Sequence, residues 1–448
     1  MDQTVARNYS SVFSIKGLVE TQLKKISTIT VIDLDLPFVF RFEISNCNLL
    51  TWLNSQETKP CFYFASRNKK WEIAGLGQYH NQARQGITLQ QWHQLIEKHP
   101  YAEDLRLFFI RNFSSGEAWS EFSLLQNTLP LVFRERIGEK FYQTHLINPE
   151  QFSSSKSLQT YLADCVEGSS AELEDCLVET LPRLKNRKDL PNQDQWIELV
   201  HTALQQIENH TIEKVVLARR SDFNFDDNLN PLVLLQALKN INQTVYNFLY
   251  SPKVDHSFLG ASPERLFSVT KTSIKTEALA GTVNGSSLAD NLFSNKNLKE
   301  HEFVVKGLCR KLGSIANQIV TDAKPTSLHL ADLVHLKTRI QGTLSKEISL
   351  NKIIECLHPT AAVCGYPSES SANFIETLEP FARGLYAGPI GIAKKDALEC
   401  AIALRSCLIT PSKISVFAGA GIVAESEAEK EWEELETKIS TVFNIFKS

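Results

Sequence analysis

The strand-like segments of this chain occur in groups, whereas a parallel sheet would need them to alternate regularly with helices. Ile29–Asp35, Phe38–Ile44 and Cys61–Ala65 in the first half are rich in apolar, β-branched and aromatic residues, as strands are. Apolar residues recur with helical spacing later, in Asp194–His210 and in Asn297–Val320. Grouped strands followed by helices favour an α+β fold.

The composition is that of a globular protein. The chain has 448 residues, of which 43% are hydrophobic and 22% charged, and its net charge is −4. This charge gives no reason to expect binding to nucleic acid or to a membrane surface. No run approaches the ~18 apolar residues of a membrane span, and the N-terminus lacks the apolar core of a signal peptide. We therefore expect a cytoplasmic protein.

The nine cysteines include no C-x-x-C pair, and their number is odd. A zinc site would need tighter clustering of cysteine with histidine. We expect free thiols, as in proteins of a reducing compartment.

A polar stretch at Lys185–Gln195 is the best candidate for a boundary within the chain. It is short, so we expect a loop inside one folded unit and no linker between separate domains. It would divide a variable N-terminal part, residues 1–190, from a motif-dense region, residues 191–448.

The last predicted helix, Ser426–Phe446, carries charges beside its apolar stripe. At ~100° per residue, Glu431, Glu434 and Lys438 fall within an arc of about 60° next to that stripe. A solvated acidic helix with an i,i+4 Glu–Lys pair would explain them equally well. A second acid, Glu300, shares a helix face with Val304 and could be a first-turn charge or a ligand. Carboxylates from two helices would suit Mg²⁺, which is a hard cation.

Three further segments could carry chemistry. The run Ala418-Gly-Ala-Gly-Ile422 follows the predicted strand Ile414–Phe417 and could let backbone N–H groups approach an anion, or form a tight turn. Lys214 begins an apolar strand that includes Val215–Leu217; it is a snorkelling surface residue or, if buried, a general base. Glu264, at a strand end in Ser262-Pro-Glu264, is a turn-capping residue or a buried general acid.

The remaining polar residues of interest have simple structural explanations. His335 follows an apolar run, as core histidines do, and Thr360 lies in a His-Pro-Thr turn. Glu379 and Arg383 have the spacing of an ordinary helical salt bridge. Arg405 interrupts an apolar segment, so it needs a partner, and a carboxylate ligand would suit its planar fork.

Taken together and in order, nine segments from Glu213 to the C-terminus resemble the chorismate-utilising enzymes. As a set they are highly specific, whereas no single one would be. The segments are KVVLARR, FLGASPERLF, EALAGT, KNLKEHEFVV, HLKTRIQGTL, LHPTAAVCGYP, EPFARGLYAGPIG, IALRS and VFAGAGIVAESEAEKEWEELETK.

The resemblance implies one large α+β domain of two stacked, mainly antiparallel sheets with flanking helices. It implies Mg²⁺ as the cofactor, with Glu300 and Glu434 as ligands and Glu431 beside them. It implies Lys214 as catalytic base and Glu264 as catalytic acid. The other residues that it places around the substrate are Ala280, Gly281, His335, Thr360, Tyr386, Arg405, Gly419, Ala420, Gly421 and Lys438.

Three positions resemble the isochorismate-forming branch of this family. Ammonia-using members generally carry Gln where this chain has Lys214, and the aminodeoxychorismate type has a lysine that is missing from Ala278–Thr282. Anthranilate and salicylate synthases tend to have a lysine in the segment that here reads Cys364-Gly-Tyr-Pro-Ser368. Salicylate synthase, and a catalytically silent chorismate-binding homologue, are the alternatives. The glycines that relatives often carry before a Trp are absent from Leu107–Phe113.

The resemblance implies a Mg²⁺-dependent interconversion of chorismate and isochorismate, by water addition at C2 and loss of the C4 hydroxyl. Because water is the nucleophile, no glutaminase subunit is implied, and we expect a monomer. Menaquinone, siderophore and salicylate biosynthesis all remain open as the downstream route.

Overall fold

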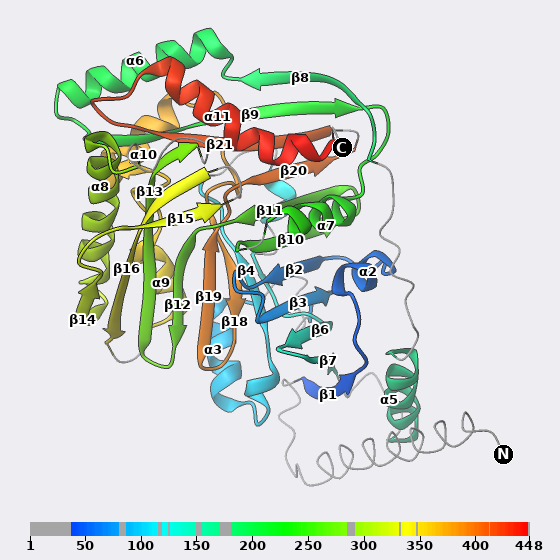
Figure 1. The fold of residues 1–448 in the computed structure, drawn as a ribbon. Helices are drawn as coiled ribbons and strands as arrows, with labels where there is room; N and C mark the ends of the chain where they lie inside the picture. The colour runs from blue at the N-terminus through cyan, green and yellow to red at the C-terminus, as the bar shows by residue number, and fades with distance from the viewer. Residues whose placement is uncertain are drawn as a thin grey trace.

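The computed structural model describes residues 37–79, 87–114, 119–123, 126–148, 155–169, 181–242, 244–284, 292–330, 333–345, 348–411 and 413–446. These residues form a twelve-stranded sheet and a nine-stranded sheet, with helices around them (Figure 1). The strand pairs described are antiparallel. The predicted α+β fold with two mainly antiparallel sheets is therefore confirmed.

The larger sheet contains strands from both ends of the chain. Strands from the first third pair through β2 with β10, so one sheet crosses the boundary that we predicted near residue 190. Its order is β1 (Phe38–Ile44), β7 (Lys140–Ile147), β6 (Val132–Ile137), β3 (Trp71–Leu76), β2 (Cys61–Ala65), β10 (Tyr246–Lys253), β11 (His256–Ser262), β20 (Ser406–Thr410), β21 (Lys413–Ile422), β9 (Lys214–Phe225) and β17 (Gly365–Tyr366), and β8 (Leu184–Leu190) also pairs with β9.

The smaller sheet comes mostly from the second half, and its strands run in a different direction from those of the larger sheet (Figure 1). Its order is β14 (Ala316–Thr321), β16 (Leu333–Leu344), β13 (Ser273–Asn284), β12 (Arg265–Thr270), β19 (Ala397–Ile402), β18 (Pro389–Ala393), β4 (Leu107–Ile110) and β5 (Asn127–Thr128), and β15 (Thr326–Leu330) also pairs with β16.

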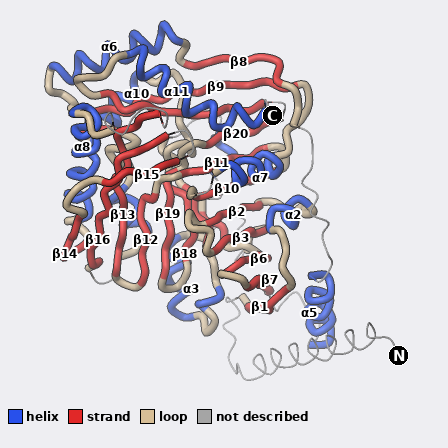
Figure 2. Tube along the Cα trace, in the orientation of Figure 1, coloured by secondary structure: helices blue, strands red, loops and turns tan. Residues whose placement is uncertain are grey.

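Helices cover the sheets from outside, as the secondary-structure colouring of Figure 2 shows. Helices α6 and α11 pack on each other and on β21, and α8 packs on β13 and β16. The helices are α2 (Leu49–Asn54), α3 (Leu89–Lys98), α4 (Ser120–Ser123), α5 (Ser155–Ser169), α6 (Gln193–Glu208), α7 (Pro231–Ile241), α8 (Asn295–Leu312), α9 (Leu350–Leu357), α10 (Ser368–Leu378) and α11 (Ala428–Phe443), with short 3₁₀ turns at Ala102–Asp104 and Asn444–Phe446.

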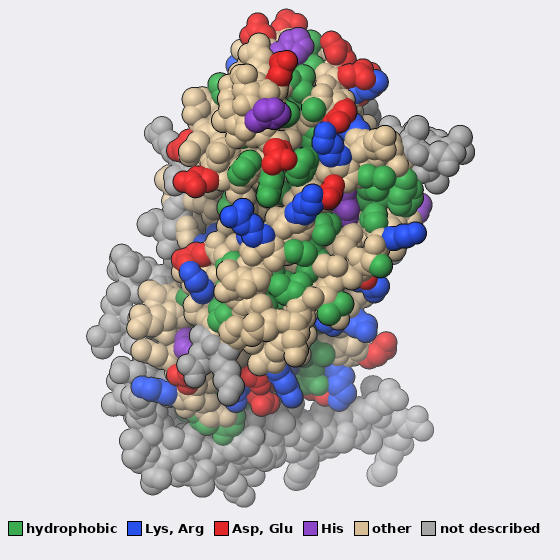
Figure 3. Space-filling view, turned by 90° about the vertical axis from the view of Figure 1, so that its left-hand side faces the viewer, with side chains coloured by type: hydrophobic (Ala, Val, Ile, Leu, Met, Phe, Trp, Pro, Cys, Tyr) green, Lys and Arg blue, Asp and Glu red, His purple; other side chains and the backbone are tan. Residues whose placement is uncertain are grey.

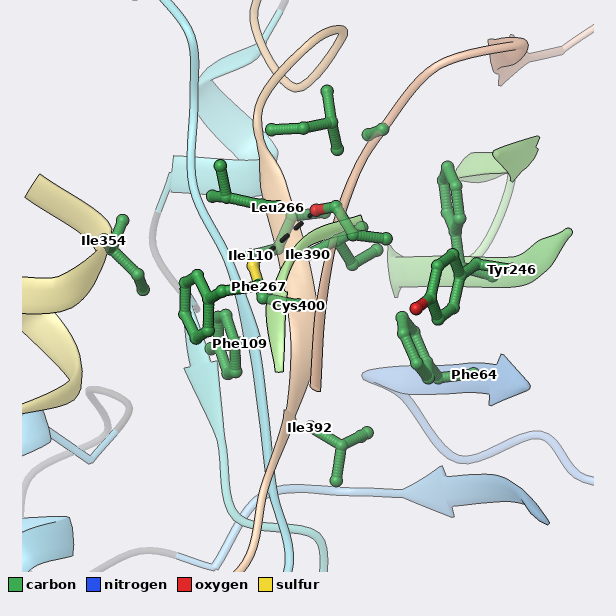
Figure 4. Close-up of a cluster of buried hydrophobic side chains, with 14 of the residues drawn as sticks. Phe64, Phe109, Ile110, Tyr246, Leu266, Phe267, Ile354, Ile390, Ile392 and Cys400 are labelled. Carbon is green, nitrogen blue, oxygen red and sulfur yellow. Dashed lines mark hydrogen bonds between the residues drawn. The ribbon is translucent and has the colours of Figure 1, made fainter. Parts of the chain in front are cut away.

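Two large apolar cores hold these layers together. The first lies between the sheets, where Phe109 and Phe267 of the smaller sheet face the same core as Phe64 and Tyr246 of the larger (Figure 4). The second lies between the larger sheet and helices α6, α7 and α11. Burial of apolar surface on both faces explains why central strands such as β2 and β21 are largely apolar.

Several predicted elements match the structure. The helix predicted at Asp194–His210 is α6, and Asn192 caps its first turn by accepting a hydrogen bond from the Gln195 N–H. The helix predicted at Ser426–Phe446 is α11 with the 3₁₀ turn that follows it. The strands predicted at Phe38–Ile44 and Cys61–Ala65 are β1 and β2. The strand predicted at Ile29–Asp35 lies outside the described residues.

Two predictions about the element boundaries were wrong. The polar stretch Lys185–Gln195 is not a loop, because Leu184–Leu190 forms strand β8 at the edge of the larger sheet, where polar side chains can face water. The helix predicted at Asn297–Val320 ends at Leu312. Gly313 caps it, and Ala316–Thr321 pairs with β16 as strand β14.

The surface and the thiols add three observations. On the face that includes α8 and β14, acidic and basic side chains are interspersed (Figure 3). No helix within the described ranges combines the length and the apolar character needed to cross a bilayer. The eight described cysteines are free thiols.

Candidate active site

A pocket opens where the two sheets meet α8 and α11, and it collects most of the predicted site residues. It is lined from the larger sheet by β21, from the smaller by β13 and β16, and from the helices by Glu300 and Glu434. The predicted residues that line it are Glu264, Ala280, Glu300, His335, Tyr386, Arg405, Gly419, Gly421, Glu434 and Lys438.

Lys214 is buried at the start of β9, directly behind the pocket wall. Its side chain is 0% exposed, and its Nζ lies 3.1 Å from Glu300 Oε1 on α8. The contact is an ion pair whose geometry falls short of a hydrogen bond. A lysine without exposure cannot be a snorkelling surface residue, so that alternative is excluded.

Glu264 also lines the pocket and is buried, in the connection between β11 and β12. Burial raises the pKa of this carboxyl to about 8, and Glu277 adds to the increase while Lys214 and Lys438 oppose it. At neutral pH this carboxyl is therefore largely protonated and can donate a proton.

Each of the three acids predicted to hold a metal is paired with a lysine. Glu300 contacts Lys214, Lys438 Nζ donates to Glu434 Oε1 at 2.6 Å, and Lys296 Nζ donates to Glu431 Oε1 at 2.6 Å. All three carboxylates also act on Lys296, whose pKa they raise although burial alone would lower it. The acids of α8 and α11 therefore share one electrostatic neighbourhood.

The donor set of these acids fits a hard cation, because carboxylate oxygens are the ligands that Mg²⁺ accepts. Burial, followed by repulsion from Glu434, raises the pKa of Glu431, as expected where like charges converge. Across the described ranges, no three His, Cys, Asp or Glu side chains are already gathered in a metal-binding group. His301 keeps α8 against the sheet, since its ring contacts the Thr338 hydroxyl at 2.8 Å and the Ala280 carbonyl at 3.2 Å.

The glycines of Ala418–Ile422 lie inside strand β21, so the alternative of a tight turn is excluded. Gly419 and Gly421 face Ala218 and Val216 of β9, but those residues bond elsewhere, through the Ala218 N–H to Glu379 and the Val216 carbonyl to Arg383. Such pairs are the non-hydrogen-bonded positions of an antiparallel ladder. Because β20 pairs with β21 only up to Phe417, the two glycine N–H groups point away from β9 without a neighbouring strand.

A side chain at either glycine would also crowd the residues around it. A Cβ at Gly421 would lie 2.4 Å from Glu300 Oε1 and 3.1 Å from Lys214 Cε, and one at Gly419 would lie 2.9 Å from the Tyr386 hydroxyl. The side chain of Ala420 points to the other face, into the core under the helices, because side chains alternate along a strand.

Arg405 and His335 form the end of the pocket near the smaller sheet. Arg405 Nη2 lies 3.4 Å from His335 Nε2, and His335 Nδ1 lies 2.9 Å from the Thr282 hydroxyl. Burial, with Arg405 and Lys438 nearby, lowers the pKa of His335 well below its usual range. The ring is therefore neutral. Arg405 has a φ of 46°, a left-handed conformation that is uncommon for a residue with a side chain.

The remaining predicted residues differ in how close they lie to the pocket. Tyr386 lines it, and burial raises the pKa of its hydroxyl. Thr360 is buried, and its hydroxyl has no partner among the residues that the structure describes. Gly281 occupies a β-bulge of β13 with φ of 74°, where its backbone brings Ala280 to the pocket wall.

The predicted salt bridge of Glu379 and Arg383 exists and is fully buried. Arg383 also donates to the carbonyls of Val363 and Val216, both at 2.7 Å, and so ties α10 to the strand behind the pocket. The sequence analysis did not single out Lys296 or Thr282. Lys296 stands one helical turn before Glu300, a spacing that could have identified it as a neighbour of the acids.

Comparisons with known proteins agree with this architecture. The family model described as "Chorismate binding enzyme" matches residues 36–447. The isochorismate synthase MenF of Escherichia coli K12 is 32% identical over 425 residues, which cover 92% of each chain. The solved structure of the menaquinone-specific isochorismate synthase MenF from Escherichia coli superposes with a TM-score of 0.79 at 26% identity, covering 97% of this chain and 100% of that one.

A more distant solved structure supports the fold alone. Anthranilate synthase component I from Streptococcus pneumoniae superposes with a TM-score of 0.66 at 21% identity, covering 90% of this chain and 92% of that one. The family model spans nearly all of the described residues, and the relative from Escherichia coli matches along almost its whole length. The chain therefore belongs to the family of chorismate-binding enzymes.

Proposed function

We propose that the chain is an isochorismate synthase, an isomerase that interconverts chorismate and isochorismate. The observation that carries the proposal is the pairing of a fully buried lysine, Lys214, with a buried carboxyl of raised pKa, Glu264, around one pocket. A buried amine and a protonated carboxyl at the same pocket are suited to act as base and acid in one reaction. The match to isochorismate synthases along almost the whole chain supports the same activity and favours it over a salicylate synthase.

The proposed reaction requires the neutral amine of Lys214, which accepts a proton from a water molecule whose oxygen bonds to C2 of chorismate. Glu264 donates its proton to the C4 hydroxyl, which leaves as water, and both ring double bonds shift, from C1=C2 to C6=C1 and from C5=C6 to C4=C5. One water enters and one leaves, so substrate and product are isomers. In the reverse direction the acid and the base exchange roles, so the reaction runs both ways.

The substrate is a dianion, and the pocket offers positive and donor groups for it. Arg405 and Lys438 line the pocket with their charges, and the N–H groups of Gly419 and Gly421 point away from β9. Oriented N–H groups and a planar guanidinium suit carboxylates. The neutral ring of His335, held by Thr282, would orient Arg405 without adding charge.

Magnesium is the proposed cofactor. Glu300 and Glu434, with Glu431 beside them, are the residues that would hold it, because they supply hard oxygen donors at the pocket. When bound, the ion would supply positive charge that neutralises the ring carboxylate. Glu300 is paired with Lys214, so its role as metal ligand and its role as partner of the base compete.

The context of the reaction follows from the relatives. The solved structure from Escherichia coli is that of a menaquinone-specific isochorismate synthase, and the similarity to it favours menaquinone biosynthesis over a siderophore route. A cytoplasmic location, a monomeric state and independence from a glutaminase subunit remain predictions.

The decisive experiment is incubation of the purified chain with chorismate and Mg²⁺, with products separated by chromatography and identified by mass spectrometry. We expect isochorismate, at the mass of chorismate, and its loss when EDTA is added. Salicylate together with pyruvate would instead identify the lyase alternative. Unchanged chorismate that still binds would contradict the proposal and favour the silent homologue.

A further inference from the structure

Glu264 is carried by a very short connection, Ser262-Pro263-Glu264, which we call the acid turn. One side of this turn is tied to the end of β19. The Ser262 hydroxyl donates to the Ile402 carbonyl at 2.5 Å and accepts from the Glu264 N–H at 3.2 Å. The Ile402 N–H in turn donates to the Glu264 carbonyl at 3.1 Å. These bonds leave the carbonyl of Pro263 available to a different partner.

That partner is Arg67, which comes from the loop after β2 in the first part of the chain. Its Nη1 donates to the Pro263 carbonyl at 3.0 Å and to Glu277 Oε2 at 2.8 Å, while its Nη2 donates to Glu277 Oε1 at 2.6 Å. One guanidinium therefore joins the acid turn to a carboxylate on β13. A planar fork with several donors can do this, whereas a lysine cannot make the same three bonds.

Glu277 is a buried anchor for both sides of the acid turn. Besides Arg67, it accepts a hydrogen bond from Arg265 Nη1 at 3.0 Å and pairs with Lys337 Nζ at 3.1 Å. Arg265 directly follows Glu264, so Glu277 holds one neighbour of the acid directly and the other, Pro263, through Arg67. Burial alone would raise the pKa of Glu277, but Arg67, Lys337 and Arg265 outweigh it and hold the pKa at about 2.

We propose that Arg67 and Glu277 are positioning residues that aim the Glu264 carboxyl into the pocket. The inference rests on the proposed function, in which Glu264 is the acid, and it assigns a role in the reaction to a residue of the N-terminal part. Arg67 acts through the backbone of Pro263 and through Glu277, and it does not line the pocket. A small displacement of an acid from its proton acceptor is enough to slow a reaction strongly.

The first test compares Arg67→Gln and Arg67→Lys with wild type in the isochorismate assay. We expect Arg67→Gln to lower kcat on the order of 10- to 100-fold while the KM for chorismate changes by less than about threefold. Arg67→Lys should restore part of kcat, because an ammonium still pairs with Glu277 but cannot bridge it to Pro263. If kcat of Arg67→Gln stays within about twofold of wild type, the proposal is wrong.

The matched control is Arg106→Gln. Arg106 makes a two-bond pair with Glu135, at 3.0 and 2.7 Å, which is more deeply buried than the Arg67–Glu277 pair. It lies far from the acid turn in the sequence and outside the pocket lining. This variant should lose thermal stability without losing kcat. Equal losses of kcat in both Gln variants would mean that any broken buried pair impairs the enzyme, and the positioning role would be abandoned. If the Gln variants fold poorly, Arg67→Lys and Arg106→Lys give the same comparison.

A second readout uses the charge of Glu277. The groups that act on Glu264 are Lys214 on β9, Glu277 on β13 and Lys438 on α11, and Tyr386 interacts with it as well. Since the Glu277 carboxylate favours the protonated form of Glu264, Glu277→Gln should move the alkaline limb of the kcat profile to lower pH. A merely structural carboxylate would leave that limb in place, and this outcome would overturn the proposal.

The result can be separated from a failure of the proposed function. If the wild-type protein forms no isochorismate, the proposed function is rejected. The positioning role would then be tested by a measurement that does not depend on turnover. For this, the pH dependence of unfolding is compared between the Glu277→Gln and Glu277→Gln/Glu264→Gln variants. The pH range over which the two curves diverge reports the pKa of Glu264 in the absence of the Glu277 charge. We expect it to lie below the pH range over which the curves of wild type and Glu264→Gln diverge. Identical ranges would contradict the coupling of Glu277 to the acid.

Discussion

Lys214 Nζ lies 3.1 Å from Glu300 Oε1, so the proposed base on β9 is paired with a proposed metal ligand on α8. Gly421 of β21 lies against both, because a Cβ there would be 2.4 Å from the Glu300 carboxylate and 3.1 Å from Lys214 Cε. Three elements distant in the sequence therefore meet at one point. The pair also lowers the pKa of Glu300 although burial opposes this, which keeps the carboxylate ionised and suited to a cation.

Replacement of the base should separate chemistry from binding. We expect Lys214→Ala to lower kcat on the order of 10²- to 10⁴-fold, the range typical of general acid–base catalysis, with chorismate binding retained. Glu264→Ala should behave in the same way. Turnover can be followed by product chromatography and binding by titration calorimetry. Lys299→Ala is the control, since Lys299 lies on the same helix as Glu300 but makes only an exposed pair with Glu425. Turnover near that of wild type in either site variant would refute its assigned role.

The raised pKa of Glu264 should appear as a pH dependence of stability. The pKa rises from 4.5 to about 8 on folding, so the protonated form is favoured in the native state. This contribution is fully present below pH 4.5 and is lost as the pH rises to about 8, at roughly 1.4 kcal/mol per pKa unit. Wild type should therefore lose stability relative to Glu264→Gln across this range in denaturant titrations. Parallel curves for the two proteins would show that the carboxyl is not perturbed.

Magnesium binding should depend on the carboxylates of one face of α11. Glu434→Ala is expected to abolish Mg²⁺-dependent activity and to weaken Mg²⁺ binding measured by calorimetry. The neighbouring Glu433→Ala should change neither, because Glu433 is exposed on another face of the helix. Both variants lose one negative charge, and they differ only in the face of α11 from which the carboxylate is removed. Equal Mg²⁺ affinity in both variants would contradict the proposed metal ligands.

Gly421→Ala should disturb the site through space alone. The added methyl group would collide with the Glu300 carboxylate and crowd Lys214, and we expect kcat to fall about tenfold or more as these groups shift. Gly307→Ala on α8 is the control, since its Cβ would have only ordinary contacts, at 3.7 Å and beyond. Alanine also favours a helix at that position. If Gly421→Ala turns over like Gly307→Ala, the close packing at Gly421 is not needed for the reaction.

Periodic patterns predicted the long elements well. The apolar residues Trp196, Val200 and Ile207 recur at helical spacing, and all three are buried in the core under α6. The stripe of Leu435, Ile439 and Val442 was found in the same way. Patterns of this kind are reliable because a helix on a sheet has to bury one continuous face.

Local patterns failed where the partner of a segment decided its structure. Leu184–Leu190 reads as a polar loop, but pairing with β9 makes it an edge strand. Ile315 and Ile319 continue the apolar spacing of α8, yet the helix ends at Leu312. The residues of β14 that follow pair with β16 in the smaller sheet. The Gly-Ala-Gly run left a tight turn open as an alternative, but pairing with β9 keeps it extended. Strand pairing joins residues far apart in the chain, so a local window cannot reveal it.

The sequence by itself determined the fold class, the family and the set of polar residues available for chemistry. It did so because apolar periodicity and ordered motifs are properties of the chain alone. Only the tertiary structure decided which of these residues meet. It buried Lys214 beside Glu300, enclosed Glu264 so that its pKa rises, and brought Arg67 from the N-terminal part to the acid turn. Burial and charge pairing depend on distances in space, and those distances follow from how the two sheets and their helices pack.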